Sequence, residues 1–337
     1  MNDARAANAR GAPDGTSARA LEGTSVGASN VSPDRTANGP AWTDGEPFAV
    51  SRPAEQRIPF VVNSPHSGRS YPEAFLRRSR LDARAVRRSE DAWVDLLLSE
   101  AVPLGAPVLQ ANFPRAWLDV NREPFELDPA MFDGPLPAHA NSRSIRVAGG
   151  LGTIPRVVAE GQPIYAGRLS VREGLRRIEE VYRPYHETLR RLMARTCLRF
   201  GYAVLLDCHS MPSAVGRGAG GGARPDVVVG DRYGTSCAPA LSRALMDAFA
   251  ARGYRTTRNK PYAGGFITEH YGRPLKGLHA VQIEINRALY MDETTLEPGA
   301  GFEALREDLG AVLAEVSARP DRELYPLDEG DVDVAAQ

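Results

Sequence analysis

The sequence has little of several features that define other classes of protein. No apolar run in its 337 residues approaches the roughly 18 residues needed to span a bilayer, so we expect no membrane segment. Its 41 basic and 42 acidic residues leave a formal charge of −1, so no electrostatic footprint for nucleic acid stands out. Three cysteines, Cys197, Cys208 and Cys237, form no paired framework and are typical of a protein from a reducing compartment.

Two further absences exclude a secretory signal and a nucleotide-binding loop. The first 45 residues lack the apolar core of a secretory signal, so we expect a cytoplasmic protein. The Gly-rich stretch at 216–222 lacks the Lys-Ser/Thr of a phosphate-binding loop and the strand–helix setting of a dinucleotide site. This stretch is therefore interpreted as a loop that could close over a ligand.

The composition divides the chain into one domain with two tails. Residues 1–45 are rich in small and polar side chains and cannot bury enough apolar surface to offset the entropy of ordering. We therefore expect a disordered tail at 1–45, a single domain at 46–325 and a second tail at 326–337. A mitochondrial presequence is the alternative for the first tail, favoured by its arginines (Arg5, Arg10 and Arg19) and opposed by its acids (Asp3, Asp14 and Glu22).

Strand-like and helix-like patterns alternate through the domain. Ser170 is a candidate N-cap for the clearest helix, and Pro184 is expected to kink that helix. A segment dense in Gly and Pro at 128–167 is expected to be a long functional loop. The other helices are expected at 82–101, 170–200, 238–251 and 300–318, and strands at 58–62, 107–111, 117–120, 202–207, 226–230, 253–257 and 279–285. This alternation predicts a three-layer α/β/α sandwich around a mixed central sheet.

Polar clusters follow three of the expected strands, at 63–68, 119–122 and 207–210. His66 lies in the first cluster and His209 in the last. Open α/β sheets gather ligand sites at the carboxyl ends of their strands, so these two imidazoles are expected to meet there. Two histidines and one acid, with a fourth position left for water, make a catalytic zinc site. The pattern therefore favours a metallohydrolase that binds one Zn²⁺.

The acidic ligand is open between two neighbours, Glu90 and Asp91. We favour Asp91 because Trp93 and Val94 place the following turn near the core. Glu90 stays open as the alternative ligand. Without a metal, both carboxylates would simply belong to a solvated helix face, which is the usual place of charges beside residues such as Arg87 and Arg88.

Other polar residues suit the chemistry around such a metal. Asp119 can accept the second ring proton of a ligand histidine, and Asn121 with Arg122 makes a fork suited to a carboxylate. Glu284 alternates with the apolar side chains of the last strand, and burial there would prepare it to act as a general base. Arg115 could polarise a carbonyl group.

Taken together, these residues resemble the N-formylglutamate amidohydrolase family. The resemblance runs from about residue 58 to 293 and includes the strings NSPHSGR (63–69), SEDAWVD (89–95), WLDVNREP (117–124), GLGTIPR (150–156), YRPYH (182–186), DCHSMP (207–212), TEHYG (268–272) and QIEINR (282–287). The pattern also resembles, more distantly, zinc carboxypeptidases and aspartoacylases. Those proteins take an acidic ligand three residues after the first histidine, where this chain has Arg69, so the acid here must come from elsewhere.

The resemblance implies a zinc-exopeptidase type of fold and a role for each residue. His66 and His209 match the zinc histidines, Glu284 the base and Arg115 the arginine beside the oxyanion. Substrate-binding residues are expected to be Asn121, Arg122 and Arg69, with Asp119 and Asp207 supporting the ligands. The implied reaction is hydrolysis of N-formyl-L-glutamate to formate and glutamate in histidine degradation. Two alternatives stay open: hydrolysis of another N-acyl amino acid, and a non-catalytic protein that binds a metal or an amino acid.

Overall fold

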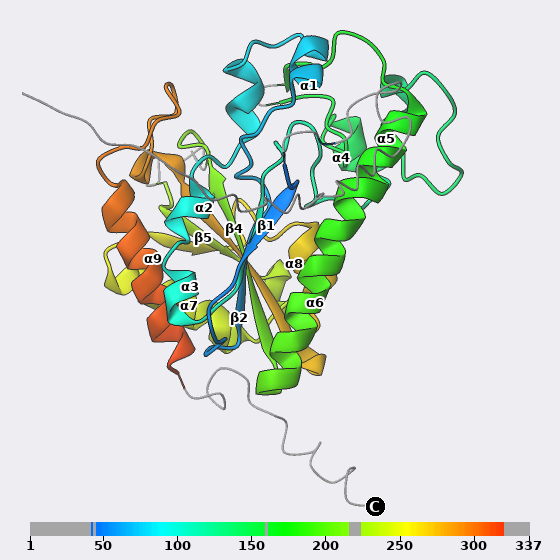
Figure 1. Cartoon of the computed structure of the whole chain (residues 1–337). Coiled ribbons are helices and arrows are strands. Elements are labelled where there is room, and N and C mark those ends of the chain that lie inside the picture. Colours follow the sequence, from blue (N-terminus) through cyan, green and yellow to red (C-terminus); the bar gives the residue numbers. More distant parts are fainter. Residues whose placement is uncertain (1–41, 43–44, 159–160, 216–223, 320–337) are drawn as a thin grey trace, which may run out of the picture. The chain divides into compact units, whose positions relative to one another are not determined.

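A seven-stranded mixed sheet forms the centre of the protein. The computed structural model describes residue 42 and residues 45–158, 161–215 and 224–319 (Figure 1). The strands lie in the order β1-β3-β2-β4-β7-β5-β6, and β2, β3, β4 and β7 are parallel to one another. Strand β1 pairs antiparallel with β3, and β5 pairs antiparallel with β7. The strands are β1 (Phe48–Ser51), β2 (Phe60–Ser64), β3 (Val108–Ala111), β4 (Ala203–Met211), β5 (Val227–Gly230), β6 (Thr256–Arg258) and β7 (Leu278–Asn286).

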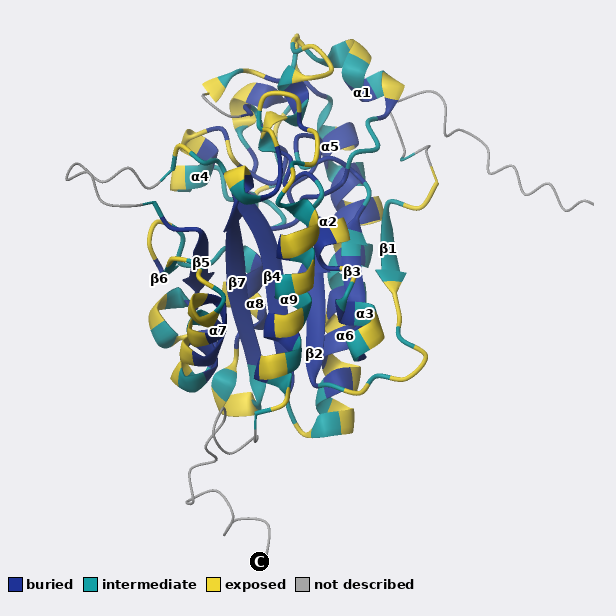
Figure 2. Cartoon of the chain, turned by 90° about the vertical axis from the view of Figure 1, so that its left-hand side faces the viewer, coloured by how far each residue is buried: buried dark blue, intermediate teal, exposed yellow. Residues whose placement is uncertain are grey.

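Helices cover both faces of this sheet. On one face α2, α3, α7 and α9 pack against Val204, Leu206 and Ile283, and on the other α6 and α8 pack against Ala203, Leu205 and Ala280. The buried strands between these layers are dark in Figure 2, whereas the outer face of α9 is exposed. The helices are α1 (Glu73–Arg78), α2 (Val94–Leu97), α3 (Ala101–Leu104), α4 (Ile145–Ala148), α5 (Val171–Arg177), α6 (Arg183–Phe200), α7 (Pro239–Ala251), α8 (Phe266–Tyr271) and α9 (Phe302–Ser317). The expected three-layer α/β/α architecture is confirmed.

The longest expected helix is confirmed with its cap. The Ser170 side chain accepts a hydrogen bond from the backbone N–H of Glu173, as an N-cap does. The helix passes through a π-helical turn, η4 (Ile178–Tyr182), before continuing as α6 with Pro184 in its first turn. The distortion therefore lies just before the proline, which removes a backbone donor.

The prediction of one helix over 82–101 was wrong. The segment is broken into η1 (Ala85–Ser89), α2 and α3, and Trp93 between the first two has a φ of 67°. A non-glycine residue in this left-handed region is strained and is held by its surroundings. Here the Asp91 backbone N–H donates to the His66 carbonyl, and the Trp93 indole donates to the Leu296 carbonyl. The chain therefore leaves the helix so that Asp91 can reach His66.

Other elements also differ from expectation, and the following are examples. Residues 117–120 form turns rather than a strand, tied to the following loop by a bond from the Asp119 N–H to the Thr153 carbonyl. The edge strand β1 and the short helix α8 were missed, because neither is long enough to show a clear period. The loop at 128–167 contains only η2 (Pro129–Met131) and α4 within its described part.

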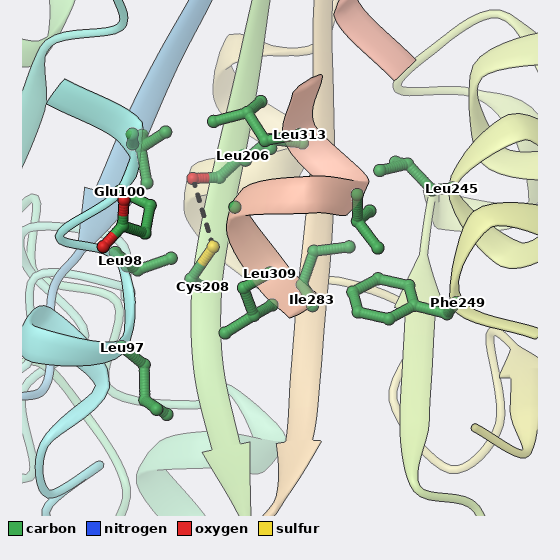
Figure 3. A pocket seen from close by; sticks show the side chains of 14 residues that line it. Leu97, Leu98, Glu100, Leu206, Cys208, Leu245, Phe249, Ile283, Leu309 and Leu313 are labelled. Carbon is green, nitrogen blue, oxygen red and sulfur yellow. Dashed lines mark hydrogen bonds between the residues drawn. The ribbon is translucent and has the colours of Figure 1, made fainter. Parts of the chain in front are cut away.

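A small apolar cavity of about 30 Å³ lies between α9 and the sheet (Figure 3). It is lined by leucines from several helices and by Cys208 of β4. Because side chains alternate along a strand, Cys208 points into this cavity while its neighbours Asp207 and His209 point to the other face. Burial also raises the pKa of the Cys208 thiol, so Cys208 is no nucleophile at the histidine site.

The chain ends bear on two of the expectations. Trp42 lies within the tail expected at 1–45, yet its ring packs against Trp117 at 5.9 Å. The rest of that tail except Gly45, the loop expected at 216–222 and the tail expected at 326–337 lie outside the described residues. Among the described helices, none is both long and apolar enough to cross a bilayer.

Candidate active site

Parallel neighbours β2, β4 and β7 bring the polar clusters to one edge of the sheet. His66 follows β2 directly, and His209 lies near the end of β4. The register pairs Asn63 with Asp207 and His209 with Glu284, so these residues arrive at the same height. The strand ends therefore fix the relative positions of two histidines and one glutamate.

His66, Asp91 and His209 form a buried group that could hold a metal ion. The His66 Nδ1 lies 3.4 Å and the His209 Nδ1 lies 2.9 Å from the same oxygen of Asp91, Oδ2. Ligands about 2 Å from a tetrahedral ion are separated from one another by about 3.3 Å, close to these values. The His66 Nδ1 is buried and has no hydrogen-bond partner among the described residues. Such an orphaned nitrogen facing a carboxylate fits a metal ligand.

Asp91, rather than Glu90, belongs to this group. The Glu90 carboxylate is turned away, where it accepts two hydrogen bonds from the Arg87 guanidinium and one from the Tyr71 hydroxyl. The Asp91 carboxylate keeps Oδ2 toward the histidines, while Oδ1 accepts from Ser210 at 3.2 Å and from Arg287 at 3.2 Å. The two neighbours differ because the backbone turns at this point.

Each histidine is supported from behind by a carboxylate. The His66 Nε2 lies 2.8 Å from Asp119, and the His209 Nε2 lies 3.0 Å from Asp207. A carboxylate in this position fixes the ring orientation and leaves Nδ1 as the free ligand atom. The structure therefore places Asp119 and Asp207 where the sequence predicts supporting residues.

Glu284 is the carboxylate of β7 that faces the same cleft. Its side chain is 8% exposed and accepts a hydrogen bond of 2.8 Å from the Gln282 amide. Burial raises the pKa of Glu284 to about 7, and the nearby Asp91 raises it as well. A carboxylate with a pKa close to neutrality can both take and return a proton.

The segment 115–122 brings two arginines and an asparagine to the site. Arg115 donates to Asp119 at 3.0 Å, and Arg122 donates to the Leu151 carbonyl at 2.8 Å. Burial lowers the pKa of Arg122 to about 10, so its guanidinium stays charged at neutral pH. The Asn121 amide nitrogen lies 3.1 Å from the His209 Nε2, and its oxygen accepts from the Ile267 N–H. In this structure Asn121 therefore holds the histidine site together.

These residues line one cleft of about 600 Å³, a size typical of small-molecule sites. Among the described residues, six arginines and three acids line it, so these side chains together carry a positive formal charge before any metal binds. The acids are Asp91, Asp119 and Glu284, and the arginines are Arg88, Arg115, Arg122, Arg146, Arg232 and Arg287. The cleft is therefore suited to an anion with more than one negative charge.

Arg69 is not among the residues that line this cleft. Both of its terminal nitrogens donate to Asp95 at 2.9 Å, and its guanidinium lies 4.7 Å from the Trp93 ring centre. The predicted role of Arg69 in substrate binding thus stays a prediction, and the structure gives this residue a partner within the protein.

The sequence reasoning missed two residues of the site. Arg287 donates to Asp91, to Ser210 and to the Glu90 carbonyl, so it orients the acidic member of the group. Gly265 leaves room for Asn121, because a Cβ on Gly265 would lie 2.5 Å from the Asn121 amide nitrogen. Arg287 ends the string QIEINR, so its position directly after the Glu284 strand was the available signal.

Comparison with known proteins identifies the family of this chain. Residues 58–291 match the N-formylglutamate amidohydrolase family. The chain belongs to that family. It is 34% identical over 264 residues to an N-formylglutamate deformylase of Pseudomonas putida, covering 77% of this chain and 91% of that protein. A second N-formylglutamate deformylase, from Pseudomonas aeruginosa, is 35% identical over 263 residues with the same coverage.

A solved structure extends the family match to three dimensions. The crystal structure of N-formylglutamate amidohydrolase from Ralstonia eutropha JMP134 superposes with a TM-score of 0.74 at 35% identity. The superposition covers 80% of this chain and 98% of that one. The matched region of this family member includes the whole of the histidine–carboxylate site.

Proposed function

We propose that this protein is a metal-dependent hydrolase that removes the formyl group from N-formyl-L-glutamate, acting in histidine degradation. The observation that carries the proposal is the convergence of His66, Asp91 and His209 with Glu284 at one cleft of a member of this family. The two relatives named as N-formylglutamate deformylases support the choice of substrate. A cytoplasmic location stays a prediction from the sequence.

The metal would be held by the two Nδ1 atoms and by Asp91. A divalent ion there, for which Zn²⁺ is our prediction, would lower the pKa of a water molecule and polarise the formyl oxygen. Asp119 and Asp207 keep the rings in place, and Arg287 with Ser210 keeps the Asp91 carboxylate turned toward them. The protein thus contributes three ligands and a rigid support for each.

Glu284 moves the proton in the proposed reaction. It accepts a proton from the attacking water, whose oxygen bonds to the formyl carbon. The C–N bond then breaks, and Glu284 returns the proton to the departing amino nitrogen, giving formate and glutamate. Arg115 is the proposed partner of the negative oxygen that develops on the formyl group, since its guanidinium faces the same cleft.

Two other arginines of the cleft are the proposed partners of the two substrate carboxylates. Arg122 is one, as the sequence predicts, and Arg146 of α4 is a second. Arg146 lines the cleft but has no carboxylate partner among the described residues, unlike Arg115 with Asp119 and Arg232 with Glu269. Arg146 also raises the positive potential at Arg122, which favours an anion between them.

The substrate is tested by measuring formate release from N-formyl-L-glutamate, with N-acetyl- and N-carbamoyl-L-glutamate in parallel. We expect rapid turnover of the formyl compound and little of the others. Faster turnover of either other compound would instead identify a related amidohydrolase. Binding of N-formylglutamate with no turnover, and no change in its affinity in Glu284→Gln, would favour a non-catalytic binding protein.

A further inference from the structure

The string YRPYH at 182–186 has no role in the function proposed so far. It spans the end of the π-helical turn η4 and the start of α6. Tyr182 and Tyr185 are 4% and 0% exposed, and both turn toward the sheet. π-Helical turns within helices are frequent near functional sites because they shift the register of the side chains that follow.

Tyr185 lies at the start of a buried chain of hydrogen bonds that ends at a proposed metal ligand. Its hydroxyl donates to the Asn63 Oδ1 at 2.6 Å, and the Asn63 Nδ2 donates to the Asp207 Oδ1 at 2.7 Å. The other oxygen of Asp207 lies 3.0 Å from the His209 Nε2. Asn63 and Asp207 are both 0% exposed, so their polar atoms depend on partners within the protein.

The hydrogen bonds from Tyr185 through Asn63 to Asp207 can run in only one donor-to-acceptor direction. The Asp207 carboxylate accepts hydrogen bonds, so the Asn63 amide nitrogen must face it and the amide oxygen must face Tyr185. Burial raises the pKa of the Tyr185 hydroxyl well above its usual value, so it remains a donor. Tyr185 thereby holds Asn63 in the orientation that positions Asp207 behind His209.

Tyr182 and His186 bind the 119–122 loop, which carries Asp119 behind the His66 ring. The Tyr182 hydroxyl donates to the Arg122 carbonyl at 2.6 Å, and the His186 Nε2 lies 2.8 Å from the Val120 carbonyl. A carbonyl can only accept, so the His186 Nε2 carries the hydrogen. These two carbonyls flank Asn121, whose side chain contacts His209.

We propose that Tyr185 is a positioning residue for His209, and that Tyr182 and His186 are positioning residues for the 119–122 loop. Their polar groups all reach the two segments that support the proposed metal ligands. The inference rests on the proposed metal-dependent function. It assigns a task to a helix on one face of the sheet, away from the reacting atoms.

The test compares Tyr185→Phe with Tyr254→Phe as a matched control. The Tyr254 hydroxyl donates to Asp308 at 2.6 Å, far from the histidines in the chain, so its loss removes one hydrogen bond without touching the site. The readouts are Zn²⁺ affinity by chelator competition, the visible spectrum of the Co²⁺-substituted protein, and the melting temperature. The spectrum reports ligand geometry, which a general loss of stability leaves unchanged.

We expect Tyr185→Phe to lower Zn²⁺ affinity roughly tenfold, the lower end of what supporting residues contribute, because Tyr185 acts through two others. Its Co²⁺ spectrum should change, whereas Tyr254→Phe should keep both properties whatever its melting temperature. In Tyr182→Phe, we expect a higher KM for N-formylglutamate with metal affinity preserved, because this hydroxyl holds the carbonyl of Arg122.

Wild-type affinity and an unchanged spectrum in Tyr185→Phe would overturn the role of Tyr185, and an unchanged KM in Tyr182→Phe would overturn that of Tyr182. If the wild-type protein binds metal but does not release formate, the proposed substrate is wrong, and the positioning roles can still be tested through metal binding. A wild-type protein that binds no metal would overturn both proposals.

Discussion

Replacement of Glu284 by glutamine should separate binding from chemistry. Glutamine keeps the length of the side chain, and its amide oxygen can still accept the hydrogen bond from Gln282. It cannot accept a proton from water. Because Glu284 itself lies outside the group of metal ligands, we expect Glu284→Gln to retain its metal and to bind N-formylglutamate normally.

The size of the defect follows from the role of a general base. Such a group contributes about 10²- to 10⁴-fold to rate, which corresponds to roughly 2.7–5.5 kcal/mol of activation free energy. Stability should change little. A neutral amide of the same size replaces the buried carboxylate without introducing a new buried charge.

The assay is steady-state formate release, measured beside metal content and melting temperature. Glu269→Gln is the matched control, since Glu269 is a 59%-exposed carboxylate that pairs with Arg232 and does not line the cleft. We expect the control to retain wild-type kcat. A Glu284→Gln protein whose kcat stays within about tenfold of wild type would refute Glu284 as the base.

Three other outcomes follow from the same geometry. Asp91→Ala should weaken Zn²⁺ binding in a chelator competition far more than Glu90→Ala, and the reverse ranking would transfer the ligand role to Glu90. Arg146→Met should raise the KM for N-formylglutamate roughly 10- to 100-fold, the effect of losing a charge-assisted hydrogen bond to one substrate carboxylate. Arg143→Met, in the same segment but outside the cleft lining, is its control, and equal effects of both variants would contradict the assignment. The value of kcat/KM should fall toward acid pH with an apparent pKa at or below about 7. The reason is that Glu284 must be deprotonated to act as the base, and a bound cation lowers its pKa. Activity undiminished at pH 4 would exclude this carboxylate as the base.

The architecture was predictable because most of its elements are long and strongly patterned. Strands β4 and β7 and helices α6, α7 and α9 all follow the expected positions. Two errors lie at the site itself, at 82–101 and 117–120. In both segments the local pattern is overruled by long-range contacts, such as those of Asp91 with His66 and of Asp119 with Thr153.

The sequence predicted several residues of the candidate site, but it did not predict all the residues that hold them in position. Strand ends and the order of the polar clusters were enough to bring His66, His209 and Glu284 together. The apolar neighbours Trp93 and Val94 favoured Asp91 over Glu90, but the backbone turn with a positive φ at Trp93 that separates the two carboxylates could not be predicted from the sequence. Arg287 could not be predicted either, because its partners Glu90 and Asp91 lie about 200 positions earlier in the chain.

The central claim is that a metal ion held by His66, Asp91 and His209 is needed for deformylation. The most direct test is to measure metal content and formate release on the same samples of wild-type protein, of His66→Ala and of His209→Ala. We predict about one Zn²⁺ per wild-type chain, loss of both metal and activity in each variant or after chelation, and recovery of wild-type activity when Zn²⁺ is restored. Formate release at the wild-type rate by metal-free protein would contradict the account.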